Sequence, residues 1–467
     1  LNFASGDSYK VSHYQQYPPD TKRIYSYFES RGNGSKEYVF DEVTFFGLQY
    51  FIQKYLVGNV VTQEKIKQAK MVYDDHFLGP KGMFYEKGWQ HILDEHDGRL
   101  PIVIKAVPEG TVVGTKNVLF TLENTDDECF WLVNFLETLL VQVWYPMSVA
   151  TSSREQKKII GHYLKKTGTN PLEYPMYSTK LHDFGYRGVS SHESAGIGGA
   201  AHLINFTGSD TVAALVVAKE FYSAKDYSTG KSLPASEHST ITSWGKDNEK
   251  DALKNMLEQY KEGPVACVSD SYNVYYATEK IWGEELKDLI MQRKQGPLVI
   301  RPDSGEPTEV IPRLLRIICE KFGCTVKEVD GVEYKVIDAP VGLIQGDGVS
   351  IESIPMIMEA MTLAGFAAEN IVLGSGGALL QKLNRDTLKC AFKCSEITRD
   401  IDGKRESSYV FKDPIEDRGK RSKQGVLTLY KLTATSFMAE VKLEIDGNEL
   451  LPTQVGEQVF AGAIAKI

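Results

Sequence analysis

His238 stands in the segment 232–245, between an acidic residue and a run of hydroxyl side chains. An imidazole is the only side chain whose ordinary pKa lies near neutrality, so it can act as an acid, a base, a nucleophile or a metal ligand. The same segment also fits a helix N-terminus, in which Ser239 or Thr240 caps the helix and His238 lies on the entering loop. The choice between these interpretations depends on what the rest of the chain places beside His238.

Two glycine turns could bind a phosphate group. Residues 374–377 read Gly-Ser-Gly-Gly and lie between an apolar run and a helical pattern, and residues 345–348 read Gln-Gly-Asp-Gly. Backbone N–H groups at a glycine turn into a helix form an anion site, to which Gly376, Gly377 and the later Arg385 would contribute. The alternative is a tight turn in which the glycines only permit positive φ. The turn lacks the Gly-Lys-Ser/Thr sequence of a Walker motif.

Charged and aromatic side chains follow other apolar runs. Arg301 and Asp303 lie two residues apart; a guanidinium suits phosphate or pyrophosphate and a carboxylate suits sugar hydroxyls or Mg²⁺, while the alternative is a salt-bridged loop. Asp210 either caps the helix that follows it or accepts hydrogen bonds from a ligand amide. Phe184 and Arg187 suit a planar ring bearing a phosphate; the alternative is a core phenylalanine and a surface arginine.

The elements that must position these residues repeat along the middle of the chain. Seven apolar runs end in polar or glycine-rich turns, each followed by a helical pattern. The run ends lie near Phe184, Asp210, His238, Asp270, Asp303, Asp347 and Gly374. Their spacing, from 26 residues (184 to 210) to 44 (303 to 347), fits a β-strand plus a crossover helix. We therefore predict an α/β fold with an irregular (β/α) barrel-like domain over residues 146–389, or a closely related α/β sheet, whose strand ends face one pocket.

The two chain ends carry short strand-like runs instead. These runs lie at 23–29, 101–107, 118–123, 409–412, 425–431 and 437–444. We predict that the ends join in a β-rich α+β domain of residues 1–145 and 390–467, in which 23–29 is a half-buried strand. Helices are predicted at 45–55 and 63–77, a buried core helix at 129–144, and loops at 403–408 and 417–425.

Composition limits the class of protein. The 467 residues are 42% hydrophobic and 25% charged, which is ordinary for a globular protein. The formal net charge of −9 argues against a general nucleic-acid binder but allows a local basic pocket. Six cysteines without a Cys-x-x-Cys pair favour a reducing compartment, so we expect a cytoplasmic protein, with a nuclear pool also compatible. No signal peptide and no membrane span are expected, and the histidines at 182 and 192 lack zinc-ligand spacing, so we assign no metal cage.

Six motifs, collinear over nearly the whole chain, resemble the type II phosphoribosyltransferases, in particular those that use nicotinamide. The motifs lie at 7–14 (Asp-Ser-Tyr-Lys-Val-Ser-His-Tyr), 182–190, 235–242, 301–305, 345–348 and 374–377. The resemblance implies transfer of a phosphoribosyl group from phosphoribosyl pyrophosphate to nicotinamide, giving nicotinamide mononucleotide and pyrophosphate in NAD salvage. It also implies Mg²⁺ bound with the pyrophosphate, ATP as an optional activating co-substrate, and a homodimer whose active sites lie at the subunit interface.

The resemblance also implies residue roles. His238 would accept the γ-phosphoryl group of ATP and act as an activator. Asp210 would accept the carboxamide N–H, and Phe184 would stack on the pyridine ring, with Tyr9 of a partner subunit on the other face. Arg301 and Asp303 would be catalytic together with His238 and would hold the ribose and the phosphates. The remaining substrate-binding positions are Arg187, Gly346 and Asp347, with Gly376, Gly377 and Arg385 at the 5′-phosphate. The pyrophosphate would lie near Arg31, Lys393 and Lys412.

Four positions depart from the family pattern: Gly6, Ser236, Gly342 and Ala378. Gly342 stands where the family often carries an arginine, so the resemblance does not extend to the contact expected there, near the tunnel or the nucleotide edge. The sequence is also compared with two other functions that this fold can have. A nicotinate-specific enzyme shares the fold but not the full set of motifs, and a non-catalytic scaffold would not need His238, Asp303 and the glycine turn together.

Overall fold

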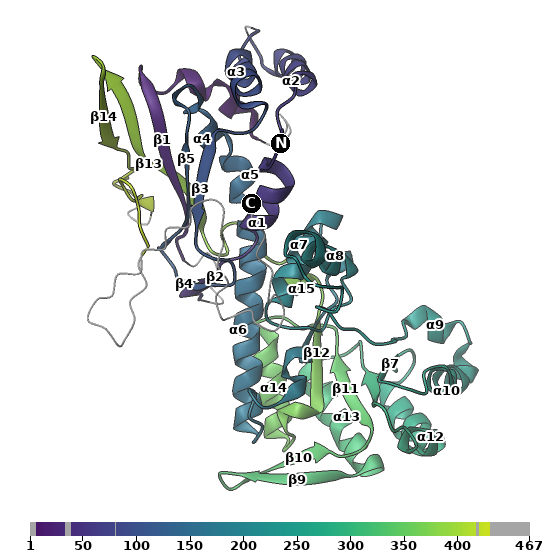
Figure 1. Cartoon of the computed structure of the whole chain (residues 1–467). Helices are drawn as coiled ribbons and strands as arrows, with labels where there is room; N and C mark the ends of the chain where they lie inside the picture. Colours follow the sequence, from purple (N-terminus) through teal and green to yellow (C-terminus); the bar gives the residue numbers. More distant parts are fainter. Residues whose placement is uncertain (1–5, 33–38, 80, 417–419, 430–467) are drawn as a thin grey trace. The chain divides into compact units, whose positions relative to one another are not determined.

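A computed structural model describes residues 6–32, 39–79, 81–416 and 420–429 (Figure 1). The chain forms two compact units. The terminal unit comprises residues 1–151, 220–224 and 384–467, and the barrel unit comprises 152–219 and 225–383. The observed boundaries at 151 and 384 each lie six residues from the expected 145 and 390, and the short segment 220–224 joins the terminal unit.

The terminal unit is built on a five-stranded antiparallel sheet, and this confirms the expected β-rich class. Its strand order is β14 (Lys404–Tyr409), β13 (Cys390–Ile401), β1 (Thr21–Ser30), β5 (Val118–Asn124) and β3 (Ile102–Ala106). Strand β1 lies at the centre and pairs with β13, so the two chain ends form one sheet (Figure 1). Because neighbours flank it on both sides, β1 is buried from Ile24 to Ser30 rather than half-buried as predicted.

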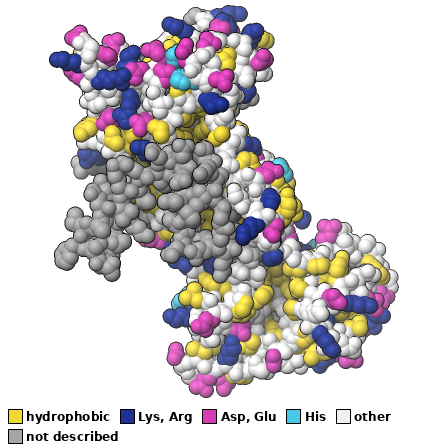
Figure 2. Space-filling view, viewed as in Figure 1, with side chains coloured by type: hydrophobic (Ala, Val, Ile, Leu, Met, Phe, Trp, Pro, Cys, Tyr) yellow, Lys and Arg dark blue, Asp and Glu magenta, His cyan; other side chains and the backbone are white. Residues whose placement is uncertain are grey.

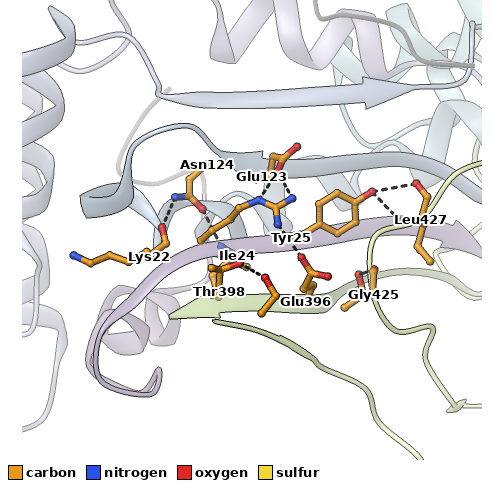
Figure 3. Close-up of polar contacts among 12 residues, drawn as sticks. Lys22, Ile24, Tyr25, Glu123, Asn124, Glu396, Thr398, Gly425 and Leu427 are labelled. Atoms are coloured by element: carbon orange, nitrogen blue, oxygen red, sulfur yellow. Dashed lines mark hydrogen bonds and ion pairs between the residues drawn. The ribbon is translucent and has the colours of Figure 1, made fainter. Parts of the chain in front are cut away.

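A cross-strand ion-pair group ties three of these strands together. Arg23 on β1 donates from Nε to Glu123 of β5 at 2.6 Å and from Nη1 to Glu396 of β13 at 2.8 Å. Figure 3 shows Glu123 and Glu396 approaching from the strands on either side, and the Tyr25 hydroxyl beside the backbone of Leu427. The segment around Leu427 therefore lies against the sheet without adding a strand to it.

Several predicted boundaries near the C-terminus were wrong. Residues 403–408, predicted as a loop, are largely the exposed strand β14, whose polar sequence hides its pairing with β13. The predicted strand 409–412 contributes only Tyr409 to β14, and the described residues 425–429 contain no strand. The predicted strand 437–444 and the end of 425–431 lie outside the described residues.

Short helices surround the sheet of the terminal unit. They are η1 (Ser8–Gln15), α1 (Leu48–Phe51), the π-helix η2 (Ile52–Leu56), α2 (Gln63–His76), α3 (Glu86–His96), η3 (Asp127–Cys129), α4 (Leu132–Phe135) and α5 (Glu137–Val141), with a small ladder of β2 (Glu42–Thr44) and β4 (Val112–Gly114). The predicted helix 63–77 is confirmed as α2, whereas 45–55 becomes helical only at Leu48. The segment 129–144 is buried as predicted, but it is broken into η3, α4 and α5 before the long helix α6 (Trp144–Lys166).

The barrel unit confirms the predicted α/β class. Its parallel sheet has the order β6 (Leu181–Asp183), β12 (Ile371–Ser375), β11 (Val341–Gln345), β8 (Leu298–Arg301) and β7 (Val265–Val268). Three single parallel bridges continue the pairing from β6 back to β7: Asp183 with Ser209, Gly208 with Lys231, and Ala235 with Ala266. The seven predicted segments thus follow one another around an irregular barrel in sequence order.

Two of the seven segments are shorter than predicted. The runs that end near Asp210 and His238 make single bridges instead of strands. Pro234 carries no N–H group for a ladder, which accounts for the brief pairing of the second run. The 44-residue spacing is also explained, because a hairpin of β9 (Cys324–Val329) and β10 (Val332–Ile337) is inserted after the helix that follows Asp303.

Helices follow the strands of the barrel unit, as Figure 1 shows for α13 and α14 beside β11 and β12. They are η4 (Pro175–Thr179), η5 (Tyr186–Gly188), α7 (His192–Leu203), α8 (Val212–Phe221), α9 (His238–Thr242), η6 (Lys246–Asn248), α10 (Glu249–Gln259), α11 (Val274–Tyr276), the π-helix η7 (Ala277–Glu285), α12 (Lys287–Met291), α13 (Pro307–Phe322), α14 (Ser353–Leu363), η8 (Ala368–Asn370) and α15 (Gly377–Leu380). Helix α13 buries Ile311, Leu314, Leu315 and Ile318 at helical spacing, and these pack with strand residues such as Ile300. This core fixes the strand ends that carry the candidate site.

The surface agrees with the composition. On the face drawn in Figure 2, Lys and Arg side chains are interspersed with those of Asp and Glu. Within the described ranges, no helix combines the length and the apolar character needed to cross a bilayer.

Candidate functional site

Phe184 lies directly after β6 and covers the ends of two neighbouring strands. A Cβ atom built on Gly374 of β12 would stand 2.1 Å from Cε2 of the Phe184 ring, and one built on Gly346, just after β11, would stand 3.3 Å from it. The ring centroid of His182 lies 4.9 Å away. Phe184 is only partly buried, so the alternative of a core phenylalanine was wrong, and an aromatic face lies at the carboxyl edge of the barrel.

Gly374 should be irreplaceable for this ring position. We expect Gly374→Ala to displace the Phe184 ring and to cost about 1 to 3 kcal/mol of stability, as overpacking typically does. The matched control is Gly342→Ala on the adjacent strand, where the new Cβ would meet Val299 Cγ2 at an ordinary 3.9 Å. Thermal unfolding of both variants checks this: equal midpoints would contradict the close packing of Phe184 on Gly374.

Asp210 does not cap the helix that follows it. Its Oδ1 accepts a hydrogen bond from His182 Nε2 at 2.9 Å and another from the Ser232 hydroxyl. Helix α8 begins at Val212. In the turn before it, the Ser209 hydroxyl accepts a hydrogen bond from the backbone N–H of Thr211 at 3.1 Å. Within the described part of the chain, Oδ2 of Asp210 accepts no hydrogen bond, so one carboxylate oxygen is available to a ligand.

The environment keeps Asp210 ionised. Burial raises the pKa of its carboxyl group, but the hydrogen bond and charge of His182, the Ser232 hydroxyl and the positive charge of Arg301 together lower that pKa below its ordinary value. The neighbouring Asp183 is fully buried, and burial raises its pKa despite a hydrogen bond from the Gly185 N–H at 2.7 Å. The two carboxyl groups therefore have different roles: Asp183 holds the backbone turn at Gly185, and Asp210 offers a negative charge to a ligand.

The loop that carries His238 is anchored to β7. Ser236 is buried, its N–H donates to the Ala266 carbonyl at 3.0 Å, and its hydroxyl accepts from the Val268 N–H at 2.9 Å. The departure at Ser236 thus has a structural use. Helix α9 begins at His238 itself with Glu237 as N-cap, so the prediction that Ser239 or Thr240 caps and His238 precedes the helix was wrong.

His238 faces two carboxylates. Its Nε2 lies 2.9 Å from Asp270 Oδ1, and its Nδ1 lies 3.9 Å from Asp303 Oδ2. Asp270 is almost fully buried, and its other oxygen accepts from the Ser304 hydroxyl at 2.6 Å. Asp270 therefore holds the imidazole in one orientation, and the half-exposed ring presents Nδ1 toward Asp303.

Arg301 and Asp303 form a loose pair rather than a closed salt bridge. Arg301 Nε lies 3.8 Å from Asp303 Oδ1, beyond hydrogen-bond distance. That buried Nε has no hydrogen-bond partner among the described residues, and neither oxygen of Asp303 accepts a hydrogen bond from them. Asp303 also lies 3.7 Å from the Cβ position of Gly346. A cation and a carboxylate with free hydrogen-bonding capacity therefore lie beside Phe184, and the exposed Asp347 follows Gly346.

The second glycine turn packs against the segment that carries Arg187. A Cβ on Gly188 would stand 3.0 Å from the Cα of Gly377, so the two backbones are in close contact, and Arg187 is exposed as the alternative predicted. The Phe184 N–H donates to the Ser375 carbonyl at 2.9 Å, which joins the two segments again. Among the described residues, a Cβ on Gly377 would meet no atom within 4 Å, so open space lies over the turn of Gly376 and Gly377.

The terminal unit brings together a second set of predicted residues. A cavity of about 650 Å³ is lined by Arg31, Lys393 and Lys412, with Lys389, Lys420 and the acidic Glu137 and Asp386. Arg385, which the resemblance assigns to the 5′-phosphate with the glycine turn, also lines this cavity. Burial lowers the pKa of Lys393, as do the nearby charges of Arg31, Lys10 and Lys412, while Glu137 raises it. The buried Arg31 Nη2 has no hydrogen-bond partner among the described residues. The cavity therefore concentrates positive charge that suits an anion.

Tyr9 lies on η1 of the terminal unit and is 57% exposed. The adjacent Lys10 is buried, and its Nζ binds Glu137 at 2.7 Å. Helix η1 is therefore anchored through Lys10, and Tyr9 presents its ring outward.

Sequence reasoning missed the residues that orient the predicted ones: His182 and Ser232 at Asp210, and Asp270 and Ser304 at His238. A signal was present, since His182 lies in the Phe184 motif and Asp270 ends its own apolar run. The pairs are 28 and 32 residues apart in the chain, and the spacing alone does not say which strand ends touch.

Comparison with known proteins finds two family models along the chain. Residues 179–446 match the model of the nicotinate phosphoribosyltransferase (NAPRTase) family, and residues 2–104 match that of the nicotinamide phosphoribosyltransferase N-terminal domain. The chain is 47% identical over 431 residues to a nicotinamide phosphoribosyltransferase of Xanthomonas campestris pv. campestris, covering 92% of this chain and 87% of that one. It is 32% identical over 449 residues to that of Acinetobacter baylyi, covering 90% and 86%.

Two solved structures share the fold at 14% sequence identity. Human nicotinic acid phosphoribosyltransferase has a TM-score of 0.51, covering 84% of this chain and 74% of that one. The nicotinate-nucleotide pyrophosphorylase of Pyrococcus furiosus has a TM-score of 0.50, covering 87% and 77%. At this identity the likeness concerns the fold alone.

Proposed function

The chain belongs to the nicotinate phosphoribosyltransferase family, and we propose on that premise that it transfers the phosphoribosyl group of 5-phosphoribosyl 1-pyrophosphate to nicotinamide. The products are nicotinamide mononucleotide and pyrophosphate, and the reaction serves NAD salvage. The observation that carries the choice of substrate is the ionised Asp210, held by His182 beside the Phe184 ring.

Asp210 selects the amide by charge. A carboxylate with a free Oδ2 accepts an N–H of the carboxamide, whereas it repels the carboxylate of nicotinate. Phe184 stacks on the pyridine ring, and His182 links the two because it contacts Phe184 and binds Asp210. The preference for nicotinamide over nicotinate is thus set by the Asp210 carboxylate, which is held beside the Phe184 ring.

Transfer proceeds at the ribose C1. The bond from C1 to the pyrophosphate oxygen breaks, its electron pair leaves with pyrophosphate, and the pyridine nitrogen forms the new bond to C1. Positive charge develops on the ribose, so the free carboxylate of Asp303 stabilises it, while Arg301 offers its unpaired Nε to a phosphate oxygen. Asp303 and Asp347 would hold a Mg²⁺ brought with the pyrophosphate, since Mg²⁺ binds through one or two carboxylates plus phosphates. Bound Mg²⁺ neutralises charge on the leaving group.

The phosphate groups have two sets of partners. The open turn of Gly376 and Gly377, with Arg187 beside it, suits the 5′-phosphate. The cavity lined by Arg31, Lys393, Lys412 and Arg385 suits pyrophosphate and the adjoining phosphate. We propose that the residues of this cavity and Tyr9 complete the site in a homodimer, with Tyr9 coming from the partner subunit. A cytoplasmic location stays a prediction.

His238 is proposed as a phosphoryl acceptor rather than a base. With Nε2–H donated to Asp270, the lone pair lies on Nδ1, which faces the pocket. Nδ1 attacks the γ-phosphorus of ATP, an N–P bond forms, and ADP leaves with the electrons of the broken P–O bond. We expect His238→Ala to keep the basal rate and to lose the ATP-dependent gain. Turnover with and without ATP measures both; loss of the basal rate in a folded variant would contradict the activator role.

The overall proposal is tested with purified protein, phosphoribosyl pyrophosphate and Mg²⁺, by comparing nicotinamide with nicotinate. We expect nicotinamide mononucleotide as the product and a large preference for nicotinamide. Comparable turnover of nicotinate would favour an enzyme of dual specificity, and turnover of nicotinate alone would favour a nicotinate-specific enzyme. An absence of phosphoribosyl pyrophosphate binding by calorimetry would favour a non-catalytic role.

A further inference from the structure

A cluster of nitrogen, oxygen and sulfur donors lies in the terminal unit, outside every residue assigned a role above. His91 Nε2 lies 2.8 Å from Asp126 Oδ2, and His96 Nε2 lies 2.6 Å from the same oxygen. One donor atom each of His91, Asp126 and Cys129 lies within 4.8 Å of the other two. Among the described residues, these three form the group of His, Cys, Asp or Glu side chains close enough together to hold a metal ion. His96 joins them through its contact with Asp126, and we call the four residues the donor cluster.

The fold brings the donor cluster together from two elements. His91 lies in the middle of α3 and His96 at its end, and Asp126 and Cys129 come from the two ends of η3, with Asp126 as its N-cap. Aromatic packing joins these elements, because the rings of Trp89 on α3 and Trp131 just after η3 are 4.9 Å apart at 70°. The positions of the donors are therefore set by the core.

The backbone orients the carboxylate of Asp126 toward the histidines. Its Oδ1 accepts from the Glu128 N–H at 2.8 Å, and its main-chain carbonyl accepts from the Asn124 side chain at 2.8 Å. This leaves Oδ2 for the two imidazoles. Their side chains are 29% and 30% exposed, whereas Cys129 is fully buried, so the cluster has a closed inner side and an entry path from solvent.

Two imidazole nitrogens, one thiolate and one carboxylate oxygen form a four-ligand set that zinc prefers in tetrahedral sites. Ligands at about 2.0 to 2.3 Å from zinc lie roughly 3.3 to 3.8 Å from each other. The donors of His91, Asp126 and Cys129 lie within 4.8 Å of one another, and His96 Nε2 lies 2.6 Å from Asp126 Oδ2, so small side-chain adjustments would bring the four to such spacings. We propose that a Zn²⁺ ion binds to His91, His96, Asp126 and Cys129. Each imidazole then binds the ion through Nε2 with its proton on Nδ1, so the His–Asp hydrogen bonds are lost, and the Cys129 thiol proton and any second imidazole proton leave to solvent. The carboxylate and thiolate then balance the charge of the ion.

The bound ion would clamp α3 to η3. The cluster shares no residue with the strand-end site or the basic cavity, so its role is structural and independent of phosphoribosyl transfer. A closed set of four protein ligands, without a position for water, is typical of structural zinc sites.

The test uses the full chain, free of any histidine tag, after treatment with a chelator. We expect one equivalent of Zn²⁺ by calorimetry and elemental analysis, a higher thermal midpoint, and with Co²⁺ a thiolate-to-cobalt charge-transfer band. His91→Gln should weaken binding by at least about 10-fold, because even partners outside the ligand set contribute that much. Cys129→Ser should remove the charge-transfer band.

Matched controls separate the cluster from incidental binding. His76→Gln alters an exposed histidine on α2, and Cys324→Ser alters a cysteine of β9; both should bind metal as the parent does. Should Cys129→Ser fail to fold, His91→Gln at the surface still decides the question. Binding below stoichiometry in the parent, or equal affinity in His91→Gln, would overturn the proposal and leave two histidines paired with Asp126 as ordinary ion pairs.

Discussion

Asp303→Asn should lower kcat/KM for phosphoribosyl pyrophosphate by about 10² to 10³-fold, the usual effect of removing one oriented group that stabilises transition-state charge. The side chain keeps its size but loses its negative charge. In the structure Asp303 lies 3.8 Å from Arg301 Nε and 3.9 Å from His238 Nδ1, and neither of its oxygens accepts a hydrogen bond from the described residues. Its charge is therefore available to the developing ribose cation and to Mg²⁺. Steady-state kinetics without ATP measures the effect.

The absence of ATP matters in that measurement, because Asp303 also faces His238 and its loss would otherwise mix two effects. Asp330→Asn is the matched control: Asp330 is an exposed residue at the turn between β9 and β10, and asparagine tolerates its positive φ of 51°. A thermal midpoint equal to that of the parent would show that the Asp303 variant is folded. A decrease of kcat/KM no larger than that of the control would remove Asp303 from the reaction.

Asp210→Asn should reverse much of the preference for nicotinamide. We expect kcat/KM for nicotinamide to fall by about 10 to 100-fold, since a hydrogen bond to a charged group contributes about 1.5 to 3 kcal/mol. The value for nicotinate should rise, because the repulsion between two carboxylates is gone and asparagine can donate an N–H. The ratio of the two kcat/KM values is the measurement.

The pH dependence offers a further check on that variant. The pKa of Asp210 lies below its ordinary value in the folded protein, so the carboxylate stays charged and the preference should hold throughout the neutral range. It should weaken only as pH falls through that lowered pKa. Asp251→Asn on the exposed face of α10 is the control for loss of one surface charge. Unchanged selectivity in Asp210→Asn would exclude Asp210 as the selecting group.

Local sequence patterns determined the repeated strand–helix order of the barrel unit. Apolar runs, glycine turns and crossover-length spacings are properties of consecutive residues, so the α/β class, the seven segments and the strand-end positions of Phe184, Asp210, His238 and Asp303 could be predicted. The sequence places Gly346 and Gly374 in glycine turns, but Gly374 lies within β12, and the sequence does not show why both residues are glycine. They are small because the Phe184 ring lies on them, and that ring comes from a segment more than 150 residues earlier.

What the tertiary structure decided were the contacts between distant segments. Burial of β1 depends on β13, which pairs with it from the other end of the chain, and the polar β14 becomes a strand only because β13 offers an edge. The partners of the predicted site residues, His182 for Asp210 and Asp270 for His238, depend on which strand ends become neighbours. The donor cluster likewise exists only where α3 packs on η3. Hydrophobic periodicity indicates which face of a segment is buried, but it does not indicate which other segment covers that face. The hydrogen-bond partners of the site residues depend on which segments pack together, so only the tertiary structure determines them.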